Sequence, residues 1–181
     1  MNIKKTIMKI ARSNAGGALA SFCVRRCLWL IPVKVNTRSK RCVMLRHPQP
    51  MSDMHSIVIP RKRFVDIEAL LNNEGEWMEF AAFLEENVRF DEVSLCCNYG
   101  CRQEVKQVHI HVLPKEMLAE RKDETTDCME LEGRKAGFSS RSNIYMNAAD
   151  LCCAEYVRKV FKEAHRRYLK GFSLIWQLSH V

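Results

Sequence analysis

The sequence predicts an α+β domain, and three observations lead to that class. Apolar and β-branched runs at 42–45 and 56–59 end near prolines, which is typical of strands. Between residues 64 and 88 the apolar side chains recur every three or four positions, which indicates one or two amphipathic helices. Two more strand-like runs follow at 92–98 and 106–113. The order strand, strand, helix, strand, strand favours an antiparallel sheet of about five strands with one or two packed helices.

Length and composition limit the remaining possibilities. The chain has 181 residues, of which 47% are hydrophobic and 28% charged, and these values are ordinary for a globular protein. They exclude a chain that is disordered throughout. No uncharged apolar run reaches the roughly 18 residues of a membrane-spanning helix, so no transmembrane segment is expected.

Shifts in composition divide the chain into four segments. We expect a basic, partly helical N-terminal extension (1–34), the strand-and-helix domain (35–115), a charged linker or loop (116–146) and a C-terminal helical extension (147–181). The linker is expected because the segment after Pro114 is charged, contains Ser and Thr, and includes two glycines. The helix at the end is expected from an apolar stripe with basic residues facing away.

The net charge of +8 belongs to one segment. Residues 1–52 hold eleven Lys and Arg and no acidic side chain, whereas the rest holds 18 basic and 21 acidic residues. Such a lead-in predicts an anionic partner or an import receptor, and it leaves mitochondrial targeting as an alternative to the cytoplasm. Nucleic-acid binding through this segment is a further alternative, although no aromatic residues are interleaved with the basic ones.

The nine cysteines favour reduced thiols inside the cell. Their number is odd, and four of them form the adjacent pairs Cys96-Cys97 and Cys152-Cys153, which bridge poorly. The spacing of Cys23 and Cys27 is not that of a zinc knuckle. We expect no disulfide framework and no required cofactor.

The most informative stretch is 107–114, where polar and apolar residues alternate. In a strand this pattern places Gln107, His109 and His111 on one face, with the two imidazoles about 7 Å apart. Such a pair suits metal ligation, or a nucleophile beside an anion-binding neighbour. A solvated polar strand face without any function also fits the alternation.

A short loop leads into this stretch. It contains Asn98, Gly100 and Gln103, and backbone N–H groups of such a loop can hold a phosphate beside the histidines. His47 and His55 lie upstream in the neighbouring strand region, where they can come near the same place.

Two motifs in this order resemble the histidine triad (HIT) superfamily. The segment from Asn98 through 103–114 is similar to an Asn and Gly followed by Gln-x-Val-x-His-φ-His-φ-His-φ-φ, where φ is hydrophobic. The segments 47–50 and 55–62 resemble the other motif, an acidic-φ-x-Pro stretch followed by His-x-φ-φ-φ-Pro-Lys. The helical separation between them also fits, and the resemblance covers roughly residues 42–115.

The resemblance implies a HIT-like nucleotidyl hydrolase or transferase. Such an enzyme cleaves a phosphoanhydride, phosphoramidate or phosphoester bond at a nucleotide's α-phosphate. His109 maps to the nucleophile that forms a nucleotidyl-histidine intermediate, and His111 to the histidine that binds the phosphate. The nucleotide-binding positions implied are His47, Asn98, Gly100, Gln103 and His55. The partners implied are a nucleotide or nucleotide conjugate and a second copy of the chain in a homodimer.

Two departures from the family pattern keep other hypotheses open. The first triad position is Gln107 rather than histidine, and His47 stands where the family usually has an acidic residue for the ribose hydroxyls. One alternative is a nucleotide-binding or regulatory protein with little catalysis. Another is a zinc-binding module built from His109, His111, His55 or His47 and a nearby cysteine, Cys96 or Cys97.

Overall fold

The computed structural model of the chain describes residues 14–30, 33–119 and 125–178. In chain order its elements are α2 (Asn14–Arg26), the 3-10 helix η1 (Leu28–Leu30), β1 (Val35–Arg38), β2 (Cys42–Arg46), β3 (Ser56–Pro60), α3 (Ile67–Leu71), α4 (Glu74–Asn87), β4 (Val93–Asn98), η2 (Gly100–Arg102), β5 (Ile110–Pro114), α5 (Lys115–Ala119), β6 (Thr125–Leu131), β7 (Arg134–Ser139), β8 (Asn143–Asn147), η3 (Ala148–Asp150), α6 (Ala154–Arg167) and β9 (Ser173–Gln177).

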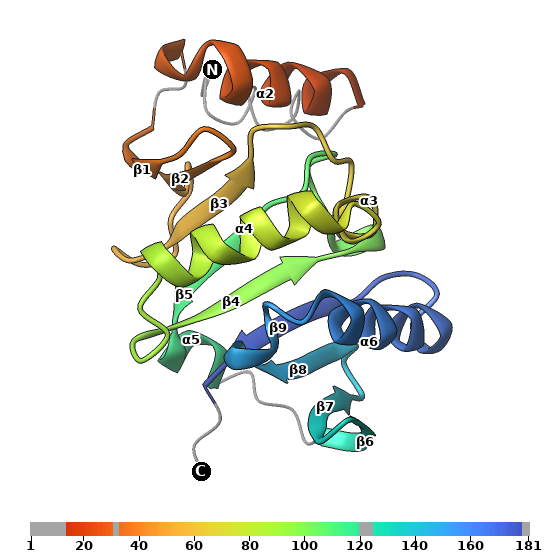
Figure 1. Cartoon of the computed structure of the whole chain (residues 1–181). Helices are drawn as coiled ribbons and strands as arrows, with labels where there is room; N and C mark the ends of the chain where they lie inside the picture. Colours follow the sequence, from red (N-terminus) through yellow and green to blue (C-terminus); the bar gives the residue numbers. More distant parts are fainter. Residues whose placement is uncertain (1–13, 31–32, 120–124, 179–181) are drawn as a thin grey trace.

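One sheet carries all nine described strands (Figure 1). Their order is β1-β2-β3-β5-β4-β9-β8-β7-β6, and every neighbouring pair is antiparallel except β8 and β9. The α+β class and the mainly antiparallel sheet are therefore confirmed. The expected number of about five strands holds only for β1 to β5, and the chain adds four more to the same sheet.

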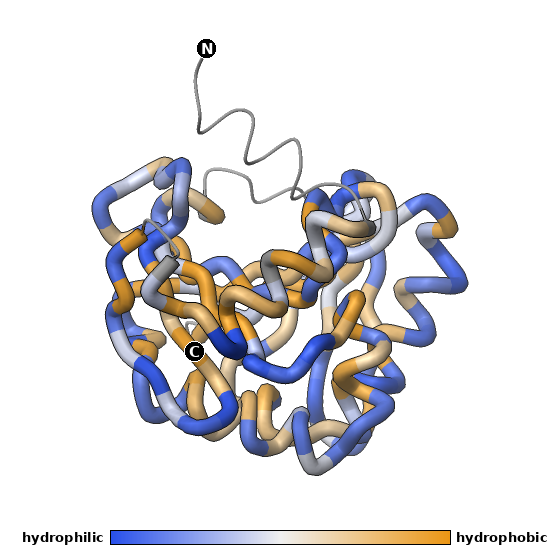
Figure 2. The backbone as a smooth tube through the Cα atoms, turned by 90° about the horizontal axis from the view of Figure 1, so that it is seen from above, coloured by the Kyte–Doolittle hydropathy of each residue, from blue (hydrophilic) through white to orange (hydrophobic). Residues whose placement is uncertain are grey.

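The helices α3, α4 and α6 cover one face of the sheet and enclose the main core. N-cap side chains begin α3 and α4: the Asp66 side chain accepts a hydrogen bond from the Ala69 N–H, and the Asn73 side chain accepts one from the Glu76 N–H. Hydrophobic stretches of the chain lie towards the inside and hydrophilic ones towards the outer loops (Figure 2).

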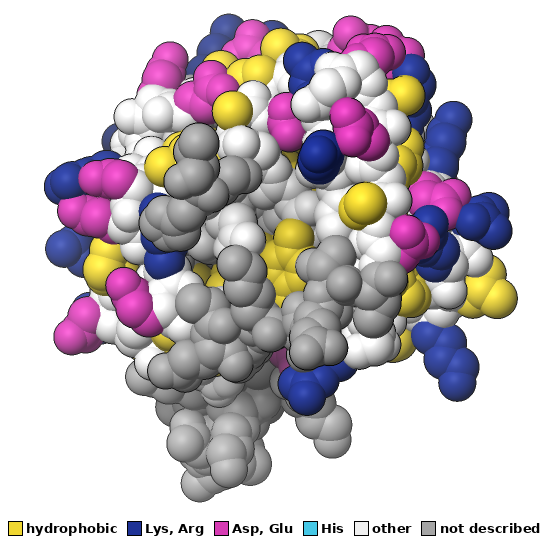
Figure 3. Space-filling view, turned by 90° about the horizontal axis from the view of Figure 1, so that it is seen from below, with side chains coloured by type: hydrophobic (Ala, Val, Ile, Leu, Met, Phe, Trp, Pro, Cys, Tyr) yellow, Lys and Arg dark blue, Asp and Glu magenta, His cyan; other side chains and the backbone are white. Residues whose placement is uncertain are grey.

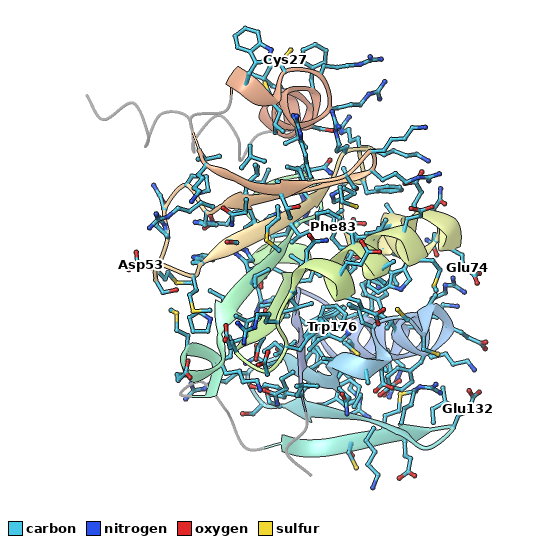
Figure 4. The ribbon with its side chains drawn as sticks, turned by 60° about the vertical axis from the view of Figure 1, so that its left-hand side comes forward. Cys27, Asp53, Glu74, Phe83, Glu132 and Trp176 are labelled. Carbon is cyan, nitrogen blue, oxygen red and sulfur yellow. The ribbon has the colours of Figure 1, made fainter. Side chains whose placement is uncertain are left out.

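Two tryptophans join the halves of this core. Trp77 on α4 and Trp176 on β9 are both fully buried, with ring centroids 6.4 Å apart. The Trp77 ring N–H donates to the carbonyl of Leu151, just before α6. Figure 4 shows Phe83 and Trp176 in the interior, with Glu74 and Glu132 at the periphery. Strands β1–β5 and β6–β9 therefore share one interior.

The opposite face of the sheet is divided into two apolar patches. At one end Val24 of α2 packs on β2 and β3. At the other end Leu118 of α5 packs on β4, β5, β8 and β9 beside Ile175. Between these patches this face carries the histidines.

Residues 116–146 are not a linker, contrary to the sequence expectation. They hold the end of α5 and the strands β6, β7 and β8. Glu132 and Gly133 both have positive φ and form the tight turn of the β6–β7 hairpin, so the glycine marks a turn and not a loose loop. The charged residues that suggested a linker occupy the exposed edge of the sheet.

Three smaller boundaries also differ. Strand β1 lies ahead of 42–45, the first run that the sequence predicts as a strand. The last helix begins at Ala154 rather than near residue 147. The C-terminal segment is not purely helical either, because it ends in β9, which pairs with both β4 and β8.

The position of β9 bears on the expected homodimer. Backbone groups of β4 that face away from β5 pair with β9 of the same chain. A second copy therefore cannot add its own strand to β4, and a homodimer would have to use another surface.

The basic N-terminal segment is only partly described. Residues 1–13 lie outside the described residues, so an import receptor, an anionic partner and mitochondrial targeting stay predictions. On the described surface seen from below, basic and acidic side chains are interspersed rather than grouped by sign (Figure 3). Among the described helices, none is both long and apolar enough to cross a membrane.

Candidate active site

Four histidines gather on the face of the sheet opposite α3, α4 and α6. His47 and His55 flank the β2–β3 connection, His111 lies in β5, and His109 lies just before it. His47 stacks on His55 with ring centroids 4.1 Å apart, and His111 lies 5.3 Å from His55 and 4.9 Å from His109. The two motifs quoted above are thus brought together in space.

Strand β5 is shorter than the alternation of polar and apolar residues predicts. The strand was expected over 106–113 but begins at Ile110, and residues 105–107 bend. The bend lets the His109 ring turn back, so that its Nδ1 lies 2.9 Å from the Gln107 carbonyl oxygen. A carbonyl can only accept, so Nδ1 carries the proton and Nε2 keeps its lone pair.

A second chain of hydrogen bonds sets the proton on His111. The Met51 backbone N–H donates to Nδ1 of His55 at 3.2 Å, which leaves the proton of this neutral ring on Nε2. His55 Nε2 lies 3.0 Å from His111 Nδ1 and therefore donates to it. His111 must then carry its own proton on Nε2. These tautomers follow from the hydrogen-bond partners.

Burial keeps all four imidazoles neutral. Desolvation lowers the pKa of His109 and His47 below the usual 6.5, with a partly opposing effect from the carbonyl that each ring Nδ1 contacts. It lowers the pKa of His55 to about 4, and His47 adds to that shift. Desolvation and the three neighbouring imidazoles lower the pKa of His111 to about 2. Near pH 7 the neighbouring rings of His109 and His111 therefore offer an unprotonated nitrogen and an N–H donor, respectively.

Gln107 acts through its backbone towards His109. Its carbonyl sets the His109 tautomer, while its buried side-chain Nε2 lies within hydrogen-bond distance of the carbonyls of Pro60 and Lys62. The contact to His109 therefore does not depend on which side chain stands at position 107.

The loop at 98–103 does not have the free donors that were expected. The N–H groups of Tyr99, Cys101 and Gln103 donate to the carbonyls of Phe172, Lys170 and Gly100. The side chain of Gln103 donates to the carbonyls of Val65 and Val105. The sequence-based idea of a backbone phosphate cradle finds no support at these three amides, and Gln103 braces the loop.

Gly100 has a packing reason to be glycine. Its φ is +67°, and a Cβ there would lie 2.5 Å from the Lys170 carbonyl oxygen. Gly171 faces it, with φ of +146° and room for no Cβ beside the Tyr99 carbonyl. The two glycines let the loop come into backbone contact with residues 170–171, just before β9.

Asn98 lies beside a cavity of about 360 Å³ that also borders His111. Its Oδ1 accepts from the Ser173 hydroxyl on β9 at 2.8 Å. Arg102, Arg141 and Asn143 line the same cavity. Sequence reasoning missed these three and Ser173, because nothing in the pattern linked residues 141–143 and 173 to the histidines.

A metal ion is the other ligand that this cluster could hold. The ring nitrogens of His47, His55 and His111 that could serve as ligands all lie within 4.8 Å of one another. Of the cysteines named in the zinc hypothesis, Cys97 packs in the core on the helix-covered face, and burial raises the pKa of its thiol. The thiol of Cys96 lies on the histidine face, 3.8 Å from Asn98 Oδ1. All nine cysteines are free.

Comparison with known proteins now agrees with these motifs. The family model of the HIT domain matches residues 30–118. This segment is a HIT domain. No curated protein matches the chain. All four histidines of the cluster lie within this segment, whereas strands β6 to β9 lie beyond it.

Several solved structures are similar to parts of the chain. A histidine triad protein from Clostridium difficile has 17% identity and a TM-score of 0.42, with 53% of this chain and 88% of that chain covered. A HIT family hydrolase from Legionella pneumophila Philadelphia 1 has 20% identity and a TM-score of 0.40, with coverages of 51% and 89%. A hypothetical protein from Leishmania major has 18% identity and a TM-score of 0.46, with coverages of 82% and 96%.

Proposed function

We propose that the chain is a nucleotidyl hydrolase or transferase that attacks the α-phosphate of a nucleotide conjugate with His109. One observation carries the proposal: His109 Nδ1 is hydrogen-bonded to the Gln107 carbonyl, which leaves Nε2 unprotonated on a ring whose centroid lies 4.9 Å from that of His111. A neutral imidazole with a fixed ring is a good nucleophile near pH 7. Its start-of-strand position limits the motion of the ring.

In the first step His109 Nε2 attacks the α-phosphorus. The new N–P bond forms as the bond to the leaving group breaks, and the leaving group keeps the bonding electron pair. His111 Nε2–H donates to a non-bridging oxygen and stabilises the charge that builds up there. Because His55 Nε2–H donates to His111 Nδ1, the proton of the neutral His111 ring stays on Nε2.

In the second step an acceptor releases the nucleotide. When the acceptor is water, its oxygen bonds to phosphorus and releases one proton to the solvent, while the N–P bond breaks and its electron pair returns to Nε2. The products are a nucleoside monophosphate and the free His109. A hydroxyl or phosphate acceptor gives nucleotidyl transfer by the same bond changes.

Trapping of the covalent intermediate tests the proposal. The wild-type chain is mixed with an α-³²P-labelled adenosine 5′-phosphate ester, quenched in denaturant without acid, and separated from free nucleotide. We expect acid-labile label on the wild type and none on His109→Ala. His165→Gln is the matched control, because His165 lies on α6 against Tyr99 and Phe161 on the other side of the sheet.

Two other outcomes have definite meanings. Label that survives in His109→Ala would contradict the assignment of the nucleophile. Nucleotide binding by the wild type without label and without turnover would favour the regulatory alternative, a HIT-fold protein that binds nucleotides with little catalysis.

The grouping of His47, His55 and His111 supports a metal site as the second candidate. His111 belongs to both candidates, as the phosphate-binding histidine of the first and as a ligand of the second. Metal analysis of untagged protein decides between them: zinc at one ion per chain favours the metal site, and activity that is retained in EDTA favours the nucleotidyl transfer.

A further inference from the structure

Helix α2 and the 3-10 helix η1 lie at one end of the molecule, outside β1–β3 (Figure 1). One side of α2 is fixed to the domain, where Val24 and Ser21 are buried. Gly17 comes so close to the neighbouring backbone that a Cβ there would lie 3.0 Å from the Lys106 carbonyl oxygen. Residues 17, 21 and 24 recur at the helical spacing and form one stripe. The opposite side of α2 is therefore held away from the sheet.

That outward side is apolar and exposed to solvent. Leu19 is 56% exposed and Phe22 is 55% exposed, and their spacing of three places them on one side of the helix. Trp29 of η1 is 81% exposed, although tryptophan is a residue that folded proteins usually bury. We call these three side chains the outer apolar group. Large apolar side chains that gather in one exposed segment indicate an interaction surface.

Positive charges flank the outer apolar group. Arg25 and Arg26 end α2, both are exposed, and neither forms an ion pair within the described part of the chain. Arg61 Nη2 donates to the Arg25 carbonyl at 2.9 Å, which brings a third guanidinium to this end of the helix. No Asp or Glu occurs in the sequence before Asp53. The surface is therefore complementary to a negatively charged partner.

The size and residue types of this surface suit a lipid layer. With 13 residues α2 is about 20 Å long, which is too short to cross a bilayer but suits a helix that lies in the headgroup plane. Tryptophan favours that plane because its ring has an apolar body and a polar N–H. A second copy fits less well, because a two-fold interface would bring two faces together that both carry Arg25 and Arg26.

We propose that α2 and η1 form a docking surface for a membrane leaflet that contains anionic phospholipids. The outer apolar group enters the boundary between headgroups and acyl chains, and Arg25 and Arg26 contact the lipid phosphates. The buried stripe of α2 keeps the HIT domain attached to the bound helix. The inference goes beyond the proposed nucleotidyl transfer and does not depend on it, because none of these residues belongs to the histidine cluster.

The fluorescence of Trp29 tests the contact directly. The chain has three tryptophans, and Trp77 and Trp176 are fully buried, so a change in solvent exposure is reported by Trp29. The full chain is mixed with vesicles of phosphatidylcholine that contain about 30% phosphatidylserine. We expect the emission to move to shorter wavelength and quenching by acrylamide to decrease. Vesicles of phosphatidylcholine alone should cause neither change, and about 0.5 M salt should reverse both.

Flotation with the same vesicles measures the contribution of the apolar side chains. Phe22→Ser and Trp29→Ser should each lower the partition coefficient about tenfold or more, as for the loss of one apolar side chain from the membrane boundary. Both side chains are exposed, so the variants should fold like the wild type. Leu169→Ser is the matched control, because Leu169 is 83% exposed and follows α6 on the other face of the sheet.

A second pair of variants measures the contribution of charge. Arg25→Gln combined with Arg26→Gln should lower the partition coefficient about tenfold or more and make it less dependent on salt. The Arg25 carbonyl that accepts from Arg61 remains in this variant. Lys162→Gln combined with Lys170→Gln is the matched control, because it removes the same charge from exposed positions on and after α6.

Four outcomes would overturn the lipid surface. The first is a wild-type chain that does not float with anionic vesicles, and the second is an equal loss of binding in Leu169→Ser. The third is a Trp29 ring that acrylamide cannot reach before vesicles are added, because another part of the chain or a second copy then covers it. The fourth is a shift in Trp29 emission with polyglutamate or a polynucleotide but none with anionic vesicles, which would assign the surface to another polyanion.

Discussion

The two halves of the sheet contribute different things to the same site. Strands β1 to β5 provide the four histidines, which form a hydrogen-bonded set within one short region. Strands β6 to β9 provide Arg141, Asn143 and Ser173 and fix Arg102 of the first half. The groups proposed to react therefore come from the HIT domain, whereas the neighbouring cavity depends on strands added at its β4 edge.

The largest expected effect lies in the first half. His109→Gln should lower kcat/KM by at least about 1,000-fold, because the residue is proposed to make the covalent bond to phosphorus. The variant should still bind nucleotide and unfold at nearly the wild-type denaturant concentration. Turnover within tenfold of the wild type would show that His109 is not the nucleophile.

In the second half the largest effect is on stability. Trp176→Ala removes a fully buried ring from β9 and should lower the free energy of unfolding by about 3–5 kcal/mol. Because Trp176 packs on Trp77 of the other half, fluorescence and circular dichroism should report one shared transition in urea. Two separate transitions would mean that the halves are independent units despite their common sheet.

The histidines of the first half should make the stability of the whole chain sensitive to acid. The pKa of His55 is lowered to about 4 and that of His111 to about 2, so below pH 6.5 the unfolded chain binds protons that the folded chain does not. Stability should therefore be full above pH 6.5 and decrease as the pH falls towards 4, by up to about 1.4 kcal/mol per pH unit for each proton.

Urea unfolding between pH 7.5 and 4.5 checks this slope. His111→Gln cannot take up that proton in either state, so its stability should change less steeply than that of the wild type. Equal slopes would show that His111 does not contribute to the acid sensitivity.

The smallest effect is expected at the variant triad position. Gln107→His should leave kcat within about threefold of the wild type, because the contact to His109 is made by the backbone carbonyl. Steady-state kinetics with adenosine 5′-monophosphate p-nitrophenyl ester measures this kcat. A change of a hundredfold in either direction would give the side chain at position 107 a direct part in the reaction.

The sequence predicted the first half better than the second for physical reasons. The buried strands at 42–45 and 56–59 are continuous apolar runs, and the helices between 64 and 88 carry apolar side chains every three or four positions. Both patterns can be read directly from a sequence. The region 116–146 forms the edge of the sheet, where β6 and β7 carry charged side chains that resemble a linker.

The site was predictable only where its residues are close in sequence. His109 and His111 share one short segment, and the spacing from His47 to His55 matches a known motif. The contact between Arg102 and the Arg141 backbone spans 39 positions and depends on where β9 inserts. Likewise, the use of the loop amides by residues 170–172 could be found only from the three-dimensional arrangement.

The place of β9 near the middle of the sheet also determines the order in which the chain can fold. It is the last strand in chain order, yet β6–β8 join the rest of the sheet only through it. Pairing of β4 with β9 closes a loop of about 75 residues, from Asn98 to Ser173, and contacts of such long range form slowly. The strands β1–β5 can collapse before β9 arrives, and in that interval the β4 edge is open to other chains. Refolding at high protein concentration should therefore lose material to aggregation, whereas dilution should restore the yield.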